Sequence, residues 1–548
     1  MSRSPRTLAS PLASAIALAL GLVLLLPPPP AQASNTWDVI GLPITGSTGS
    51  ESGKSVATNS DGSIVAVGSP EQVLNGPGRV EVYQLTAGTW TQMGADIVGV
   101  TNYDWTGSSV ALSSDGLTVA VGAPRADPAA TNNAGVVRVY RFQSGTWVQL
   151  GADLAGTSVS QYVGSAVSLS ASGNRLALGA TGASSRGAAT IYDYTSGTNS
   201  WAQVGLSLAA EGHLDSFGFS VALSDDGTWL AVGATQNDAG GASNAGHARV
   251  YELVSTTWTQ RGADIDGEAA NDLAGRSLAL SANGQRLVIS SHNSGVVAAS
   301  AGRVRVFDYS GSAWSLVGTA LNGAAGADNF GWAVDITSAG DQVAVGARQS
   351  DVPASDAGSV TVFTLASGTW TQRGQTVTGT AASEQAGYAL AMSSSGDRIV
   401  VGSPFRALPS ANTGEVQIFG FTAASSSDSE ATPSPGQPGI YLQIAGPVGR
   451  PVLDSPIYVG SDRVAKSSHY SLLLRRVGGG FVTLAAGLVD ARGNAEMRIT
   501  LPALAPGQYM VAFRGTHADG TGLKLTNYIT VGPEGTYLVI EENQPGTW

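Results

Sequence analysis

Acidic side chains recur in this sequence at one fixed position, where together they could attract a cation or a basic partner. Seven glycines stand at similar intervals, at positions 53, 107, 164, 218, 275, 331 and 387. Three residues before these glycines stand Ser50, Asp104, Gln161, Asp215, Asp272, Asp328 and Glu384. A ring of carboxylates would focus negative potential on a bound cation. We favour the structural alternative, in which each carboxylate accepts hydrogen bonds from backbone N–H groups of its own turn.

Aromatic side chains accompany these acids and could form a rim on which a sugar stacks. They are Tyr103, Trp105, Tyr162, Phe217, Phe330, Trp332 and Tyr388. The alternative is that they belong to the packed core, where large aromatic side chains are commonly buried. The candidate ligand-binding residues are therefore Asp104, Trp105, Asp215, Asp272, Asp328, Trp332 and Glu384.

Sequence patterns for catalysis and metal binding are missing. The chain has no Cys, which excludes disulfides, thiol catalysis, iron–sulfur clusters and Cys-ligated zinc. Its five His stand in unlike contexts without an H-E-x-x-H motif, and no G-x-S-x-G elbow occurs. His213 and His292 fall in or beside loops, where we expect them to be solvated. We expect no catalytic residue, no metal and no cofactor.

The charge balance argues against nucleic-acid binding. The 548 residues include 40 acidic and 28 basic ones, a net charge of −12, and only Arg475 and Arg476 form an adjacent basic pair. A nucleic-acid binder needs a basic stripe that displaces counterions. Gly (72) and Pro (24) are enriched and charged residues make up only 12%. This composition is typical of a folded, turn-rich protein.

Three short phrases repeat along the chain and indicate the elements that must position these residues. A Trp phrase, as in GTWTQMG (88–94), places Trp at positions 37, 90, 147, 201, 258, 314 and 370. A turn phrase, as in NSDGSIVAVGSP (59–70), keeps the same interval. So does a strand phrase that ends in an aromatic residue, as in GRVEVY (78–83). We expect the recurring Trp to pack between neighbouring repeats rather than to contact a ligand.

Each repeat predicts four antiparallel strands. In the second repeat these are 107–113, 117–123, 136–142 and 146–156, where apolar and polar residues alternate between turn residues. Four-stranded units that repeat radially form a β-propeller. The last repeat lacks a fourth strand, whereas the chain begins with a lone Trp strand at 35–46. We predict that this strand completes a seventh blade and closes the ring; the alternative, an open solenoid, needs polar end caps that the sequence does not show.

The repeats resemble FG-GAP repeats, the blades of integrin-α-type propellers, over about residues 35–421. Phe-Gly occurs at 217–218 and 330–331 and Gly-Ala-Pro at 122–124, with Gly-Ser-Pro at 68–70 and 402–404. The resemblance implies an all-β, seven-bladed propeller of bacterial secreted type. It also implies calcium loops of the form DxDxDGxxD, from which this chain departs, since its tight turns carry one or two Asp at most. Calcium needs six to eight oxygen ligands, so we expect none there.

Alternating strand directions predict two unlike faces. Tight turns join the first strand to the second and the third to the fourth, and we call their side the turn face. The other connections include loops of about ten residues, such as 124–135, 235–246 and 348–358, and form what we call the loop face. Binding commonly uses the variable loops of a rigid scaffold. The loop face is therefore the candidate interaction surface.

The chain ends carry further segments. Residues 1–33 are typical of a signal peptide, with Arg3 and Arg6, an apolar run at 13–26 and Ala-Gln-Ala at 31–33; the alternative, an uncut anchor, would be short for a span. Residues 422–439 read as a Ser/Pro/Gly linker. Residues 440–532 predict seven strands of an antiparallel sandwich. They resemble the Ig-like modules of actinobacterial surface proteins, notably at 501–520, and a tail, 533–548, follows.

These observations lead to one functional expectation and two alternatives. We expect a secreted or cell-surface, non-enzymatic binding or adhesion protein, a monomer that uses the loop face. Its partner would be an extracellular protein or glycan, with no nucleic acid and no integral membrane span after signal cleavage. The alternatives are an extracellular glycan-active hydrolase or lyase and a purely structural envelope component. Convergent His or paired carboxylates at the mouth of the central channel would favour the enzyme.

Overall fold

The computed structural model describes residues 35–71, 74–407 and 412–423 with their side chains, and the backbone of eight strands between residues 440 and 541. The chain divides into two compact units, 1–425 and 426–548. The predicted signal peptide and most of the predicted linker lie outside the described residues.

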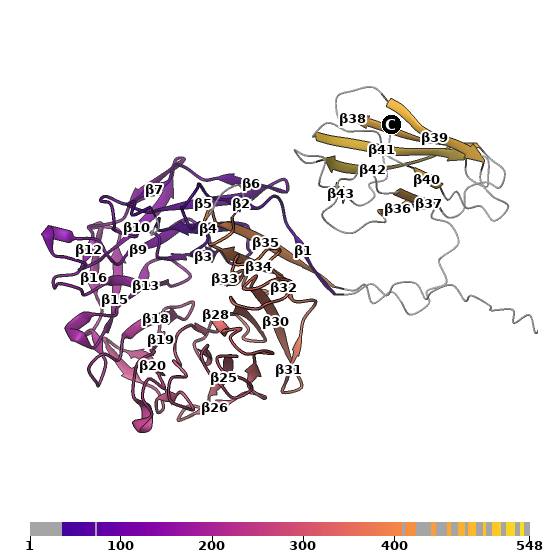
Figure 1. Ribbon diagram of the computed structural model, residues 1–548. Coiled ribbons are helices and arrows are strands. Elements are labelled where there is room, and N and C mark those ends of the chain that lie inside the picture. Colours follow the sequence, from indigo (N-terminus) through magenta and orange to yellow (C-terminus); the bar gives the residue numbers. More distant parts are fainter. Residues whose placement is uncertain are drawn as a thin grey trace, which may run out of the picture. The chain divides into compact units, whose positions relative to one another are not determined.

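The first unit is a seven-bladed β-propeller, as predicted (Figure 1). Each blade is an antiparallel sheet of four main strands, which run in sequence order from the channel outward in six blades; in the seventh, β1 is the outermost strand. The first strands are β3 (Ser55–Thr58), β8 (Ser109–Leu112), β13 (Val163–Leu169), β18 (Phe217–Leu223), β23 (Leu278–Leu280), β28 (Phe330–Ile336) and β33 (Ala389–Met392). The second strands are β4 (Ile64–Ser69), β9 (Thr118–Ala123), β14 (Arg175–Ala180), β19 (Trp229–Ala234), β24 (Arg286–Ser291), β29 (Gln342–Ala347) and β34 (Arg398–Ser403).

The two outer strands of each blade carry the strand and Trp phrases. The third strands are β5 (Arg79–Thr86), β10 (Val136–Gln143), β15 (Ala188–Thr195), β20 (His247–Val254), β25 (Arg303–Tyr309), β30 (Ser359–Ala366) and β35 (Glu415–Thr422). The fourth strands are β6 (Thr89–Gln92), β11 (Thr146–Gln149), β16 (Ser200–Gln203), β21 (Thr257–Gln260), β26 (Trp314–Leu316), β31 (Thr369–Gln372) and β1 (Thr36–Val39).

Each predicted fourth strand is interrupted by a glycine, a detail that the sequence pattern does not reveal. In the second blade Gly151, with φ of +68°, separates β11 from a two-residue strand that pairs again with β10. Glycine suits this turn because a side chain at positive φ is strained. The short strands are β7 (Ile97–Val98), β12 (Leu154–Ala155), β17 (Leu208–Ala209), β22 (Ile265–Asp266), β27 (Leu321–Asn322), β32 (Val377–Thr378) and β2 (Ile44–Thr45). Short 3₁₀ turns occupy three loops, at Pro128–Ala130, Ala183–Ser185 and Ala239–Gly241.

The N-terminal strand closes the ring. β1 pairs antiparallel with β35, with Trp37 opposite Phe421 and Val39 opposite Phe419. Figure 1 shows the indigo start of the chain lying against the orange end of the propeller. The side chain of Gln375 also brackets Trp37, accepting its backbone N–H and donating to its carbonyl, both at 2.9 Å. The prediction that the first strand completes the seventh blade is therefore confirmed.

The recurring Trp side chains join neighbouring blades around the outside of the ring. Each indole packs in a core between blades and donates its Nε1–H to a backbone carbonyl of the preceding blade. The acceptors of Trp37, Trp90, Trp147, Trp201, Trp258, Trp314 and Trp370 are the carbonyls of Arg373, Ile40, Met93, Leu150, Val204, Arg261 and Val317, at 2.6–3.1 Å. A buried indole needs such an acceptor, so one residue type supplies both apolar contact and a directional bond at all seven joints.

A second circle of hydrogen bonds runs around the channel at the turn face. One backbone N–H in each tight turn donates to the carbonyl of the equivalent residue in the next blade. The circle runs from Ser60 to Ser114, Ala171, Asp225, Ala282, Ser338 and Ser394 and back to Ser60, with N···O distances of 2.8–3.1 Å. Because the last bond returns to the first residue, these turns fix the relative positions of all seven blades.

The second strand of each blade forms the core between blades. All six residues of β4, β9 and β19 are buried. Such strands pack against neighbours on both faces and are therefore apolar along nearly their whole length. Much of the 43% hydrophobic content is used in this way.

The second unit contains two antiparallel sheets. One is three-stranded and consists of β36 (Ile440–Ile444), β37 (Ile457–Ser461) and β40 (Met497–Ile499). The other is five-stranded and consists of β39 (Phe481–Leu488), β38 (His469–Arg476), β41 (Gly507–Thr516), β42 (Gly522–Val531) and β43 (Leu538–Glu541). The seven predicted strands are present, and β43 adds an eighth where we expected only a tail. An Ig-like topology stays a prediction.

Substitution of Trp37 tests the closure. Trp37→Ala should lower the free energy of unfolding by about 3–5 kcal/mol, because it leaves a buried cavity. It also removes the indole hydrogen bond to the Arg373 carbonyl and the ring contact with Phe421. Asp38→Ala, an exposed position on the same strand, should change it by less than about 0.5 kcal/mol. Chemical denaturation followed by circular dichroism measures both values, and similar effects of the two substitutions would contradict a closing role for this strand.

Candidate functional site

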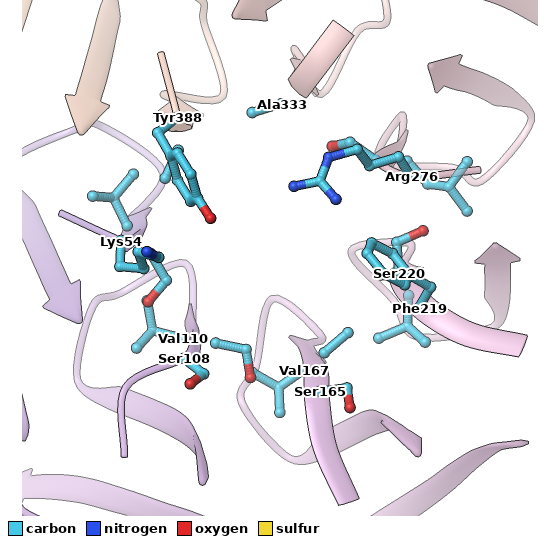
Figure 2. Close-up of a pocket in the computed structure, with 18 of the residues that line it drawn as sticks. Lys54, Ser108, Val110, Ser165, Val167, Phe219, Ser220, Arg276, Ala333 and Tyr388 are labelled. Carbon is cyan, nitrogen blue, oxygen red and sulfur yellow. The ribbon is translucent and has the colours of Figure 1, made fainter. Parts of the chain in front are cut away.

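The central channel opens into a cavity of about 620 Å³ among the seven first strands. Its mouth is set by the residue that follows the recurring glycine of each blade: Lys54, Ser108, Ser165, Phe219, Arg276, Trp332 and Tyr388. Figure 2 shows Arg276 and Tyr388 reaching into the cavity from different sides. This position starts each first strand, so the mouth lies on the loop face.

The deeper wall of the cavity is the same in every blade. Two residues further along each strand stands an aliphatic side chain: Val56, Val110, Val167, Val221, Leu278, Val334 and Leu390. The equivalent residues at the mouth differ in size, charge and polarity. The scaffold is thus sevenfold, whereas the surface that it offers at the mouth is not.

The predicted acidic residues lie beneath this surface and hold the loops that precede the first strands. Asp104, Asp215, Asp272, Asp328 and Glu384 are 3–8% exposed. Each accepts one or two backbone N–H groups from three or four residues earlier, those of Thr101, Gly212, Glu268 with Ala269, Ala325 and Thr380, at 2.7–3.1 Å. These bonds are those of the structural alternative. A ligand contact of these acids stays a prediction.

The backbone of these loops explains why an acceptor is needed there. The residues on either side of each acid have positive φ, as at Tyr103 (+73°) and Trp105 (+57°) or at Asn271 (+63°) and Leu273 (+54°). Side chains at positive φ cost on the order of 1 kcal/mol each. The buried carboxylate offsets this strain by binding N–H groups that would otherwise lack an acceptor. Burial nevertheless raises the pKa of Asp104 and Asp328.

The two predicted tryptophans, Trp105 and Trp332, line the cavity, and an arginine guanidinium group stacks on each of their rings. The Arg125 guanidinium carbon lies 3.7 Å from the ring centroid of Trp105. Trp332 has two such neighbours, Arg276 at 3.3 Å and Arg348 at 3.5 Å. Two guanidinium groups this close to one centroid fit only on opposite faces, so Trp332 is sandwiched between them. Cation–π contacts of this kind stabilise a charge without neutralising it.

These arginines have no carboxylate partner among the described residues. Arg348 donates to the amide oxygens of Gln385 at 3.0 Å and Gln349 at 3.3 Å. The Nε atoms of Arg276 and Arg348 and Nε1 of Trp332 are buried without an acceptor. Burial, together with the charge of Arg348, lowers the pKa of Arg276 to about 10. Arg276 still carries its charge at neutral pH.

His292 completes this cluster, contrary to the expectation that it is solvated. It is 8% exposed, and its ring meets that of Trp332 edge to face, with centroids 5.1 Å apart. Burial, together with the charges of Arg276 and Arg348, lowers its pKa to about 3. His292 is therefore a neutral ring at physiological pH. His213 is exposed, as expected.

Lys54 differs from the arginines because it has an acidic partner. Its Nζ lies 3.1 Å from Glu51 Oε1 and stands over the rings of Tyr388 and Phe405, 4.9 and 4.5 Å from their centroids. Of the two cations that line the cavity, Arg276 is therefore the one without a carboxylate partner among the described residues, and Arg348 adds positive charge from the other face of Trp332. None of the described residues that line the cavity is Asp, Glu or His, so a glycosidase-type carboxylate pair has no candidate within it.

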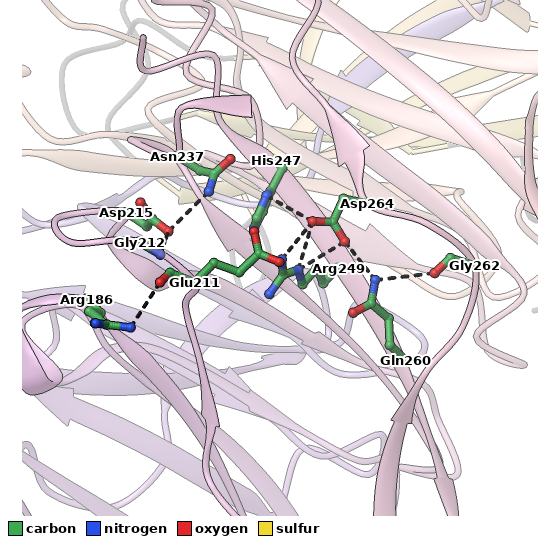
Figure 3. Close-up of polar contacts among 10 residues, drawn as sticks. All are labelled: Arg186, Glu211, Gly212, Asp215, Asn237, His247, Arg249, Gln260, Gly262 and Asp264. Carbon is green, nitrogen blue, oxygen red and sulfur yellow. Dashed lines mark hydrogen bonds and ion pairs between the residues drawn. The ribbon is translucent and has the colours of Figure 1, made fainter. Parts of the chain in front are cut away.

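A second polar cluster lies in the fourth blade, away from the cavity lining (Figure 3). His247, Asp264 and Asp266 are close enough together for metal ligands. However, Arg249 binds Asp264 with two hydrogen bonds, of 3.0 and 2.8 Å, and also pairs with Glu211. Burial and the Arg249 charge lower the pKa of His247. Because the carboxylate is already neutralised, we assign this group as an ion-pair network.

Sequence reasoning missed Arg276, His292 and Arg348, although a signal for two of them was present. The FG-GAP pattern has Pro after Gly-Ala, and this chain has Pro70, Pro124 and Pro404 at that position. In the fifth and sixth blades the same position holds His292 and Arg348. A comparison of the repeats with one another, rather than a search for shared residues, would have found them.

One family model supports the propeller repeat. The family model of the FG-GAP repeat matches residues 209–251, and no curated protein matches the chain. Among solved structures, a periplasmic gluconolactonase from Pseudomonas aeruginosa is similar at 15% identity and a TM-score of 0.43, over 85% of this chain and 99% of that one. A putative 6-phosphogluconolactonase from Bacteroides uniformis gives 13% and 0.41, over 60% and 85%. Sqt1 from Chaetomium thermophilum gives 15% and 0.42, over 68% and 83%. Likeness at this level carries no inference about function.

Substitution of Asp272 tests the role assigned to the acids. Asp272→Ala should lower the free energy of unfolding by about 2 kcal/mol, because two backbone N–H groups lose a charged acceptor. Asp272→Asn keeps one acceptor oxygen and should cost less. Thermal or chemical denaturation measures both. An unchanged stability of Asp272→Ala would show that the carboxylate does not hold its loop.

A carboxylate between the sixth and seventh blades supplies a pH-dependent test. Asp335 accepts the backbone N–H groups of Met392 at 2.7 Å and of Ile336 at 2.8 Å. In the third blade Ser168 occupies the equivalent position and accepts that of Leu223 at 3.0 Å. Burial raises the pKa of Asp335 to about 6, so the folded protein binds this proton more tightly than the unfolded chain.

Asp335→Ser should therefore change the pH dependence of stability. In the wild type, the free energy of unfolding falls as the pH rises from about 4 to 6, because in this range only the folded state keeps the proton on Asp335. Above about pH 6 the contribution of Asp335 to stability no longer changes with pH. A shift of this size corresponds to about 3 kcal/mol at most. The variant, which keeps an acceptor, should gain on the wild type between pH 4 and 6 in denaturation experiments. A difference that is independent of pH would contradict the raised pKa.

Proposed function

We propose that this protein is a secreted or cell-surface binding protein that holds its ligand at the mouth of the propeller channel and catalyses no reaction. One observation carries the proposal: the mouth position differs in nearly every blade and gathers aromatic and basic side chains over a cavity, whereas the positions below it repeat. Pockets of about 300–1,000 Å³ are typical of small-ligand sites.

The rigidity of the ring supports this assignment. Two circles of hydrogen bonds, from the Trp side chains and from the tight turns, fix the blades relative to one another. A rigid scaffold lowers the entropic cost of binding, because the side chains that meet the ligand are already positioned. The proposed surface remains the loop face, but its ligand-binding groups are Trp105, Arg276, Trp332 and Tyr388 rather than the buried acids.

The location outside the cytoplasm rests on the sequence. Residues 1–33 have the pattern of a signal peptide, and the FG-GAP match agrees with an extracellular propeller. Of the helices found in the described residues, none has the length and apolar character needed to cross a membrane.

Binding by variants of the two faces tests the proposal. The purified protein should bind one or more ligands on arrays of extracellular glycans and proteins. Trp105→Ala with Tyr388→Ala should weaken that binding at least tenfold, because both rings border the cavity. Leu117→Ser on the turn face, a partly exposed position, is the control and should leave binding unchanged. Loss of binding with Leu117→Ser alone, or turnover of an arrayed glycan, would overturn the proposal.

A further inference from the structure

The charges of Arg276 at the channel mouth and of Arg348 beside it determine which ligand chemistry can bind there. Arg276 and Arg348 lie on opposite faces of Trp332, 3.3 and 3.5 Å from its ring centroid. Neither arginine has a carboxylate partner among the described residues, although the chain as a whole carries a net charge of −12. Unneutralised, partly buried cations are costly unless an anion binds them.

Besides unpaired charges, this cluster has N–H donors without hydrogen-bond acceptors. Arg276 Nε, Arg348 Nε and Trp332 Nε1 are N–H donors that are buried without an acceptor. Most buried polar groups in proteins have a partner. Three unsatisfied donors beside two positive charges favour an acceptor that is itself negative. A carboxylate fits, because its two oxygens match the planar fork of a guanidinium group.

The opposite wall of the cavity offers acceptors instead of donors. Ser108 and Ser165 donate their hydroxyl hydrogens to the carbonyls of Trp105 and Tyr162, both at 2.7 Å. Ser165 Oγ also bonds Thr181 Oγ1 at 3.1 Å. Each serine oxygen thus keeps at least one lone pair that can accept a hydrogen bond from a ligand. In Figure 2 these serines lie across the cavity from Ala333, the neighbour of Trp332. A ligand that spans the mouth thus meets donors at one end and acceptors at the other.

We propose that the channel mouth binds an acidic saccharide, with the sugar carboxylate on Arg276, the charge of Arg348 on the other face of Trp332 adding to the attraction, and sugar hydroxyl groups on the serine side. This proposal rests on the proposed function, since it names the ligand class of the same site. A uronic acid unit carries both a carboxylate and several hydroxyl donors. An acidic protein side chain brings the carboxylate without the hydroxyls. The cavity, at about 620 Å³, has the size for one or two sugar rings.

Matched saccharides test the carboxylate. Isothermal titration of the full-length protein with an oligogalacturonate and with the neutral galactose oligomer of the same length isolates one functional group. The uronate should bind at least tenfold more tightly, and added salt should weaken its binding because charged groups are screened. Equal affinity for the two oligomers would overturn the proposal, and so would binding of an acidic peptide without binding of the uronate.

Arginine variants connect the preference to this site. Arg276→Gln and Arg348→Gln should each weaken uronate binding at least tenfold, and Arg276→Lys, which keeps the charge, less than that. Arg141→Gln is the control, since Arg141 lies on β10 outside the cavity lining, where it donates to Thr118 and Asn174 and stands over Tyr194. Melting curves identify a variant that fails to fold, and Arg348→Gln then serves in place of Arg276→Gln. Uronate binding that survives both glutamine substitutions would overturn the proposal.

The two proposals can fail separately. If neutral glycans or proteins bind and Trp105→Ala with Tyr388→Ala abolishes that binding, the loop-face site stands and only the acidic saccharide is wrong. If no ligand binds, or if no substitution at the mouth changes the affinity, the proposed function is wrong as well.

Discussion

The pairing of β1 with β35 is the contact on which the propeller depends. Without it, the outer edge of β35 would present unpaired N–H and C=O groups, and an open sheet edge invites association with other chains. The pairing also completes the Trp circle of blade-to-blade bonds, because Trp37 and Ile40 supply one donor and one acceptor of that circle. One four-residue strand therefore determines whether seven similar sheets form a closed ring.

Closure separates two kinds of position in each repeat. Glycine, Trp and the aliphatic wall residue recur because each blade must meet its neighbours in the same way. The residue after the recurring glycine faces the channel rather than the core between blades, so each blade can carry a different side chain there. A sevenfold scaffold can in this way support an asymmetric site. The acids beneath the mouth belong to the repeating kind, since each holds its own loop.

The fold could be predicted from the sequence because its signals are local and repeated seven times. The Trp intervals and the lone strand at 35–46 were enough to predict the blade number and the closure. The candidate site was harder, because its residues come from different blades. Nothing in the sequence around Trp332 shows that Arg276 and Arg348 cover its two faces. The burial of these side chains could not be predicted either, because they stand in polar, loop-like sequence; they are the acids at 104, 215, 272, 328 and 384, and His292.

The position of the closing strand imposes an order on assembly. β1 is made first, yet its partner β35 ends at Thr422, so the first segment has no neighbour until nearly the whole propeller has been synthesised. Contacts between such distant parts of a chain form slowly, because a long loop must close. The first six blades can fold in sequence while β1 is still unpaired. The ring therefore becomes complete only after β35 has been synthesised.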